Sequence, residues 1–182
     1  MKKTQQKGFT LLELLIVIAI LAVLATIAVL VINPVEYLRQ ARDSQRINDL
    51  AAVKGALDLF ASGTSTPFTA AGCFDSVGTT NPFTAVGGTC TARTIVLTNG
   101  TGWVPANLDS MAGGSPLAKL PLDPLNAGAN FYAMYATNTD SVTGAPAYEL
   151  DTVLESSKYA PMELSDGGQN NSYYEVGSKI SY

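Results

Sequence analysis

The segment KGFTLLELLIVIAILAVLATIAVLVI, Lys7 to Ile32, decides how the rest of this chain is interpreted. Of the 24 residues from Phe9 to Ile32, only Thr10, Glu13 and Thr26 are polar. As an α-helix this stretch would be ~36 Å long, enough to cross the ~30 Å hydrocarbon core of a bilayer with some tilt. It is also longer than the apolar core of an ordinary secretory signal, which has about 7–15 residues. We therefore expect a helix that stays in the membrane.

Glu13 is the single charged residue inside this apolar stretch, one helical turn after its start. A charged side chain within a membrane span costs roughly 2.5–3.5 kcal/mol on insertion scales, so it normally has a partner and a function. The alternative is a plain single-pass anchor whose glutamate lies by chance near the lipid headgroups. The basic octapeptide MKKTQQKG, residues 1–8, precedes the stretch.

The sequence GFTLLE at residues 8–13, between a basic leader and an apolar helix, resembles the type IV pilins and the related pseudopilins. In that family a membrane aspartyl peptidase cleaves after the glycine, and the new N-terminal phenylalanine is N-methylated. The resemblance implies cleavage between Gly8 and Phe9, methylation of Phe9, and a role for Glu13 in filament assembly. It covers about the first third of the chain.

A filament core built from such helices explains why a glutamate is needed there. The new amine of Phe9 and the carboxylate of Glu13 would be natural partners, within one chain or between neighbouring subunits. Removing one member of a buried ion pair costs about 3–5 kcal/mol, so the pair would fix the height at which a subunit docks.

Positive charge is more concentrated before the span than after it. Three lysines without any acid precede it (Lys2, Lys3 and Lys7), and three arginines with two acids follow it (Arg39, Arg42 and Arg46, with Glu36 and Asp43). Because positive residues tend to remain in the cytoplasm, we expect the N-terminus inside and the rest of the chain outside. The protein would be a single-pass inner-membrane protein before assembly and part of an extracellular pilus at the cell surface afterwards.

The composition argues against an enzyme and against a nucleic-acid binder. Without the three lysines of the leader, 8 of the 11 basic residues remain against 15 acidic ones, whereas nucleic-acid binding normally needs a basic patch. The chain has no histidine, which excludes Ser-His-Asp and Cys-His catalysis and histidine metal sites. We expect no catalytic site, no cofactor and no metal. Calcium held by Asp140, Asp151 and Asp166 is the alternative, although their spacing is not that of an EF-hand.

The sequence predicts an α+β, type IV pilin-like fold: a long N-terminal helix, membrane-spanning in its first half and amphipathic in its second, packed on a small antiparallel sheet. We divide the chain into a leader peptide (1–8), a transmembrane and assembly helix (9–32), an amphipathic extension (33–62) and a globular head (63–182).

The helix has two possible continuations at Asn33-Pro34. These residues fit a new helix start, with Asn as the cap and Pro in the first turn, or a single helix kinked at the proline. We favour the kink, because pilins of the family commonly carry a proline near this point. Ser62-Gly63 should end the helix through a left-handed glycine. Its buried face should contain five apolar residues at helical spacing: Ile47, Leu50, Val53, Leu57 and Phe60.

Arg39, Arg42 and Arg46 share one face of this helix. We expect them to be solvated and to pair locally with Glu36 and Asp43, each pair contributing a few tenths of a kcal/mol. The alternative is contact with lipid headgroups before assembly and between subunits afterwards.

In the head, Cys73 and Cys90 fit a disulfide in an extracytoplasmic loop better than a metal site. We place neither cysteine in the helix or in the three-stranded meander predicted for the C-terminal third of the chain. A short strand is predicted over residues 93–97, with a turn at Asn99-Gly100. After a proline-stiffened connector, three strands should form an antiparallel meander: residues 131–136, 148–154 and 173–176.

The function predicted from these features is a structural subunit of a type IV pilus. Its partners would be copies of itself in a helical filament, a prepilin peptidase and methyltransferase, an inner-membrane assembly platform, and membrane lipid before assembly. The first alternative is a pseudopilin of a type II secretion or DNA-uptake system. A membrane-tethered ectodomain with another function is the second.

Overall fold

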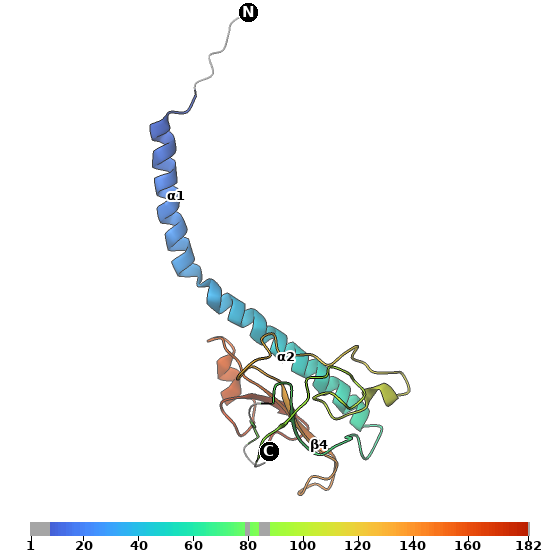
Figure 1. Ribbon diagram of the computed structural model, residues 1–182. Helices are drawn as coiled ribbons and strands as arrows, with labels where there is room; N and C mark the ends of the chain where they lie inside the picture. Colours follow the sequence, from blue (N-terminus) through green and yellow to red (C-terminus); the bar gives the residue numbers. More distant parts are fainter. Residues whose placement is uncertain (1–7, 79–80, 84–87, 182) are drawn as a thin grey trace, which may run out of the picture. The chain divides into compact units, whose positions relative to one another are not determined.

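The computed structural model describes residues 8–78, 81–83 and 88–181, and it has the expected α+β architecture (Figure 1). Two helices, α1 and α2, come first, and five strands follow, with two short 3₁₀ helices between them. Their bounds are α1 Leu11–Ile32, α2 Pro34–Ala61, β1 Gly72–Asp75, β2 Thr91–Ala92, η1 Leu108–Ser110, β3 Ala133–Thr137, β4 Ala147–Thr152, η2 Ala160–Leu164 and β5 Tyr174–Gly177. The chain divides into two compact units, residues 1–38 and 39–182.

The long helix that we expected does extend from Leu11 to Ala61, but it is interrupted at one residue: α1 ends at Ile32 and α2 begins at Pro34, so this point has the new helix start that we considered beside the favoured kink. Asn33 ends α1 in a left-handed conformation, with φ 45° and ψ 70°. Its carbonyl oxygen and its side-chain oxygen both accept a hydrogen bond from the backbone N–H of Glu36, at 3.0 and 3.4 Å. Asn tolerates this conformation better than most residues, and Pro34 has no N–H to leave unpaired at the first position of α2.

The expected apolar face of α2 is confirmed at its centre. Leu50, Val53 and Leu57 are buried, whereas Ile47 and Phe60 are only half-buried. The helix ends at Ala61, but Gly63 does not adopt the left-handed conformation that we expected. Instead, the N–H groups of residues 62 and 63 donate to the carbonyls of residues 58 and 60, and these bonds close the last turn without positive φ.

The sheet has the strand order β2-β1-β3-β4-β5. The predicted meander is confirmed as β3, β4 and β5, which pair antiparallel in sequence order. Two further strands were missed: β1 pairs antiparallel with β3, and β2 pairs parallel with β1. The strand predicted at 93–97 is wrong. The carbonyl of Val96 accepts a hydrogen bond from the N–H of Leu120, and the carbonyl of Thr98 accepts one from the N–H of Leu108. These two donors lie in different segments of the chain rather than in one neighbouring strand.

The two faces of the sheet bury different sets of residues. One face packs against α2 in the main core, with the side chains of Met134, Ala136, Tyr148 and Leu150 beside Leu50, Val53 and Leu57 of the helix. The alternate residues of the strands point the other way, and there a second, smaller core gathers Phe83, Cys90, Phe131, Ala133 and Ala147. This second face carries the disulfide loop.

Candidate functional site

The predicted cleavage site lies in an open, non-helical segment just before α1. Residues 8–10 have no regular secondary structure, and the side chain of Phe9 is 90% exposed. A Cβ atom built on Gly8 would meet nothing within 4 Å, so no described residue crowds the backbone there. The cleavage and the methylation of Phe9 remain predictions.

Glu13 is positioned by a capping box at the start of α1. Its Oε2 accepts hydrogen bonds from the backbone N–H and the hydroxyl of Thr10, at 2.9 and 2.8 Å. The Thr10 hydroxyl oxygen in turn accepts from the N–H of Glu13, at 3.2 Å. This capping box was not predicted, although the spacing Thr-x-x-Glu is its usual signal. The expected pairing of Glu13 with the Phe9 amine stays a prediction, because that amine exists only after cleavage.

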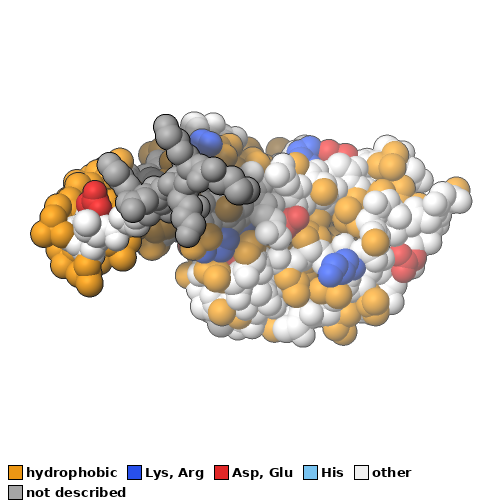
Figure 2. Space-filling view, turned by 90° about the horizontal axis from the view of Figure 1, so that it is seen from above, with side chains coloured by type: hydrophobic (Ala, Val, Ile, Leu, Met, Phe, Trp, Pro, Cys, Tyr) orange, Lys and Arg blue, Asp and Glu red, His pale blue; other side chains and the backbone are white. Residues whose placement is uncertain are grey.

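The surface of α1 is apolar on all sides. Every described side chain from Phe9 to Val29 is exposed, and in Figure 2 hydrophobic side chains surround one acidic group on the part of this helix that is in view. The helix between Leu11 and Ala61 contains one apolar segment long enough to cross a membrane, and none of that segment is buried. The 22 residues of α1 correspond to ~33 Å of helix, which matches the ~30 Å thickness of a hydrocarbon core.

Arg46 is fully buried, so the prediction of a solvated arginine face is wrong at this position. Its guanidinium donates to Asp43 at 2.8 Å, as expected for a local pair, and also to Asp123 at 2.6 Å. The same group reaches Glu155 at 2.5 Å and the side-chain oxygen of Asn130 at 3.1 Å. Burial alone would lower the pKa of Arg46, but the hydrogen bonds to Asp123 and Glu155 raise it above its ordinary value.

This cluster holds α2 against the head. The carboxylate of Asp43 accepts hydrogen bonds from the backbone N–H groups of Glu155 and Ser156, at 3.0 and 2.7 Å. Arg42 forms a 2.5 Å ion pair with Glu155 rather than with the local acids that we expected. The contacts of α2 with Asp123, Glu155 and Ser156 join residues that are 77 to 113 positions apart in the sequence, so no local pattern indicates them.

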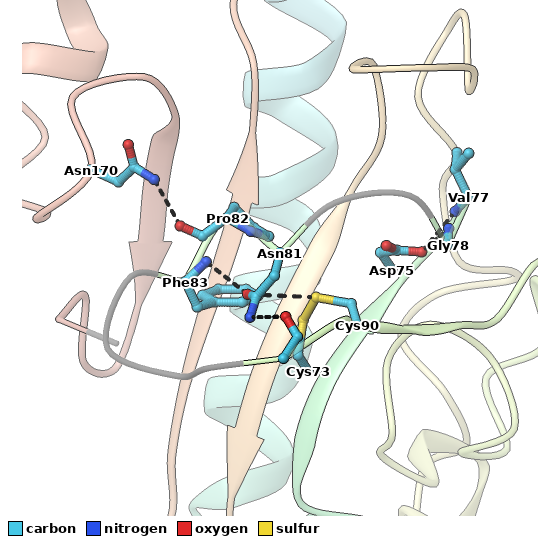
Figure 3. The surroundings of a disulfide bond; sticks show 10 residues. Cys73, Asp75, Val77, Gly78, Asn81, Pro82, Phe83, Cys90 and Asn170 are labelled. Atoms are coloured by element: carbon cyan, nitrogen blue, oxygen red, sulfur yellow. Dashed lines mark hydrogen bonds between the residues drawn. A yellow bond between two sulfur atoms is a disulfide. The ribbon is translucent and has the colours of Figure 1, made fainter.

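The head contains the expected disulfide between Cys73 and Cys90 (Figure 3). Neither cysteine lies in the helix or in the meander, as we expected, but Cys73 lies in β1, a strand that was not predicted, opposite Tyr135 of β3. The loop that the disulfide closes includes Phe83, which is buried in the second core. Its neighbour Pro82 accepts a 2.7 Å hydrogen bond from the side chain of Asn170, which ties this loop to the segment before β5.

The three acids considered for calcium are not brought together as a set. Asp140 pairs with Lys179 at 2.6 Å, and Asp166 accepts hydrogen bonds from the backbone N–H groups of Gly168 and Glu175. Asp151 instead lies in a buried group with Glu149 and Glu175. Burial, followed by the neighbouring charges of these two glutamates, raises the pKa of Asp151 well above its ordinary value.

A long N-terminal helix with an uncovered apolar half, followed by a small sheet that packs on its second half, defines a pilin-like protein. The chain carries the prokaryotic N-terminal methylation motif at residues 3–29, which is the signature of type IV pilins and pseudopilins. Proteins with this motif are structural, and the motif together with the apolar helix fits a membrane-anchored subunit. Searches of curated proteins and of solved structures found no match.

Proposed function

We propose that this chain is a structural subunit of a type IV pilus filament, cleaved after Gly8, methylated at Phe9 and polymerised through α1. One observation carries the proposal: in a chain with the methylation motif, α1 exposes apolar side chains on every side and carries a single carboxylate near its start. Lipid would cover this surface before assembly, and the α1 helices of neighbouring subunits would cover it in the filament.

Glu13 is suited to a second interaction after cleavage. Both hydrogen bonds that it accepts from Thr10 end on Oε2, and neither uses Oε1. The other oxygen could therefore accept the amine of Phe9, from the same chain or from a neighbour, without loss of the capping box. The Phe9 amine and the Glu13 carboxylate would neutralise each other in an apolar filament core, where either charge without its partner is costly.

The proposal implies processing at the cytoplasmic face of the inner membrane by a prepilin peptidase and methyltransferase, followed by extraction through an assembly platform. It is tested by shearing filaments from the cell surface and analysing them by mass spectrometry. We expect a chain that lacks residues 1–8 and carries one methyl group on Phe9. A bulky residue in place of Gly8 should block cleavage, whereas alanine should be tolerated. Full-length chains in sheared filaments would contradict the proposal, and processed chains found only in the membrane fraction would favour a pseudopilin.

Two substitutions of Glu13 separate its charge from its hydrogen bonds. Glu13→Gln retains the capping box, because glutamine serves this position as well as glutamate, whereas Glu13→Ala removes both the cap and the charge. We expect both variants to insert and to be cleaved, and both to be strongly depleted from sheared filaments. If the glutamine variant assembles at the wild-type level, the charge has no role in assembly.

A further inference from the structure

Three buried carboxylates meet on the face of the sheet that points away from α2. Asp151 of β4 lies directly opposite Glu175 of β5, and Glu149 lies two residues earlier on β4, on the same face. Glu149 and Asp151 are 0% exposed and Glu175 is 2% exposed. Each contributes an oxygen atom, and these three oxygens lie within 4.8 Å of one another. Like charges directly opposite each other on paired strands are destabilising, so the arrangement needs a compensating charge.

Asp151 gives a second observation, because its carboxylate is buried without a hydrogen bond. Among the described residues, neither of its oxygens has a hydrogen-bond partner, apart from a proton that it could share with the neighbouring carboxyl group of Glu149. Two other buried carboxylates of the head have a cation as partner: Asp140 has Lys179, and Asp123 has Arg46. Since buried polar groups in native proteins are nearly always paired, the two oxygens of Asp151 require a ligand.

We propose that Glu149, Asp151 and Glu175 bind one divalent cation of the calcium type. Oxygen-only ligands favour a hard cation over zinc or copper. Two ligands of one Ca²⁺ ion lie at most about 5 Å apart, at bond lengths of about 2.3–2.6 Å, whereas two ligands of Mg²⁺ lie at most about 4.2 Å apart. The three oxygens, all within 4.8 Å of one another, can therefore reach a single Ca²⁺ ion, and a buried site made of protein ligands suits Ca²⁺ better than Mg²⁺, which usually keeps several waters.

The surrounding loop closes the site. The N–H of Asn170 donates to Oε2 of Glu175 at 3.1 Å, and the side chain of the same asparagine donates to Pro82 of the disulfide loop. A Cβ atom at Gly168 would overlap the carboxylate of Glu175, so the loop backbone lies directly on this ligand. A bound cation would thus fix β4, β5 and the segment around Asn170, to which the disulfide loop is attached.

The test uses the full-length chain in detergent at pH 7, dialysed against a chelator and then titrated with Ca²⁺. We expect calorimetry to show one Ca²⁺ ion per chain and the melting temperature to rise with saturation. The Asp151→Asn and Glu175→Gln substitutions should abolish both the binding and the rise. Both keep the size of the side chain and remove a buried negative charge, so they should fold without the metal.

Asp140→Asn is the matched control, because Asp140 is an equally buried acid of the same head that lies outside the cluster. This variant should bind Ca²⁺ as the wild type does. A wild-type melting temperature that does not respond to Ca²⁺ would show that a shared proton neutralises the cluster and would overturn the proposal. Unchanged Ca²⁺ binding by Asp151→Asn would overturn it as well. Neither result depends on whether the chain forms a pilus.

Discussion

At the scale of single residues, Arg46 is a fully buried cation at the centre of a cluster of acids. Its guanidinium faces three carboxylates, those of Asp43, Asp123 and Glu155. Asp43 in turn holds the backbone after β4. Buried ion pairs contribute little beyond what packed apolar residues would, but removal of one partner leaves the others unpaired in a dry environment.

We predict that Arg46→Ala lowers the free energy of unfolding by about 3–5 kcal/mol, because it leaves uncompensated buried acids. Arg46→Lys should be intermediate, because an ammonium cannot reproduce the fork of hydrogen bonds that a guanidinium makes. Denaturant titration of the full-length chain measures both variants. Arg39→Ala, at an exposed position of the same face, serves as the control and should change stability by less than about 0.5 kcal/mol.

Glu155 predicts a specific dependence of stability on pH. The hydrogen bond from Arg42, helped by that from Arg46, holds the pKa of Glu155 below its ordinary value of 4.5. A carboxyl group with a lowered folded-state pKa stabilises the fold above its unfolded pKa and loses this contribution as the pH falls through the folded value. We therefore expect wild-type stability to decrease below about pH 4.5 more steeply than that of Glu155→Gln. Parallel curves in chemical unfolding at pH 3 to 6 would contradict this.

At the scale of elements, the disulfide joins a strand to a loop. Cys73 belongs to β1, and Cys90 immediately precedes β2. The bond therefore acts on the β1–β2 edge of the sheet as well as on the loop, which we did not foresee because β1 and β2 were not predicted as strands.

We predict that replacing both cysteines with serine costs about 3 kcal/mol, the value typical of a closed loop of this length. Hydrogen exchange should increase in β1, β2 and the loop around Phe83. The pairing of β4 with β5 should stay protected, because it lies at the other end of the sheet. Equal loss of protection throughout the head would show that the bond supports the whole sheet.

At the scale of the whole molecule, the segment that we propose for assembly lies outside the unit that contains the hydrophobic cores. Residues 1–38 contain the methylation motif and an apolar helix without a core of its own, whereas residues 39–182 contain both hydrophobic cores. Substitutions in one unit should therefore affect different properties from substitutions in the other.

We predict a double dissociation between two variants. Arg46→Ala should lower the melting temperature but leave cleavage after Gly8 intact, because the site of cleavage lies outside the head. Glu13→Gln should leave the melting temperature unchanged and reduce entry into filaments. The measurements are thermal unfolding, the intact mass of the membrane-inserted chain, and the yield of sheared filaments. A lowered melting temperature in Glu13→Gln would show that α1 takes part in the folding of the head.

The sequence by itself determined the features that are local in the chain. The apolar run of α1, the methylation motif, the spacing of Leu50, Val53 and Leu57, and the three meander strands each arise from residues a few positions apart. Periodicity detects such elements because a helix or a strand repeats within its own length. The residues Asn33-Pro34 also indicated a possible start of α2. The sequence could not decide between a new helix start and a kinked helix, because the two differ only in the conformation of Asn33.

The tertiary structure alone decided which distant residues meet. From the sequence, Arg46 looks like one of three solvated arginines; in the structure it is buried because residues 123 and 155 contact its guanidinium. In the same way, β1 is a strand because it pairs with β3. Likewise, Asp151 joins Glu149 and Glu175, and not Asp140 and Asp166, because strand register sets which side chains share a face. These contacts depend on how loops fold back over tens of residues, and no pattern within a single segment encodes that path.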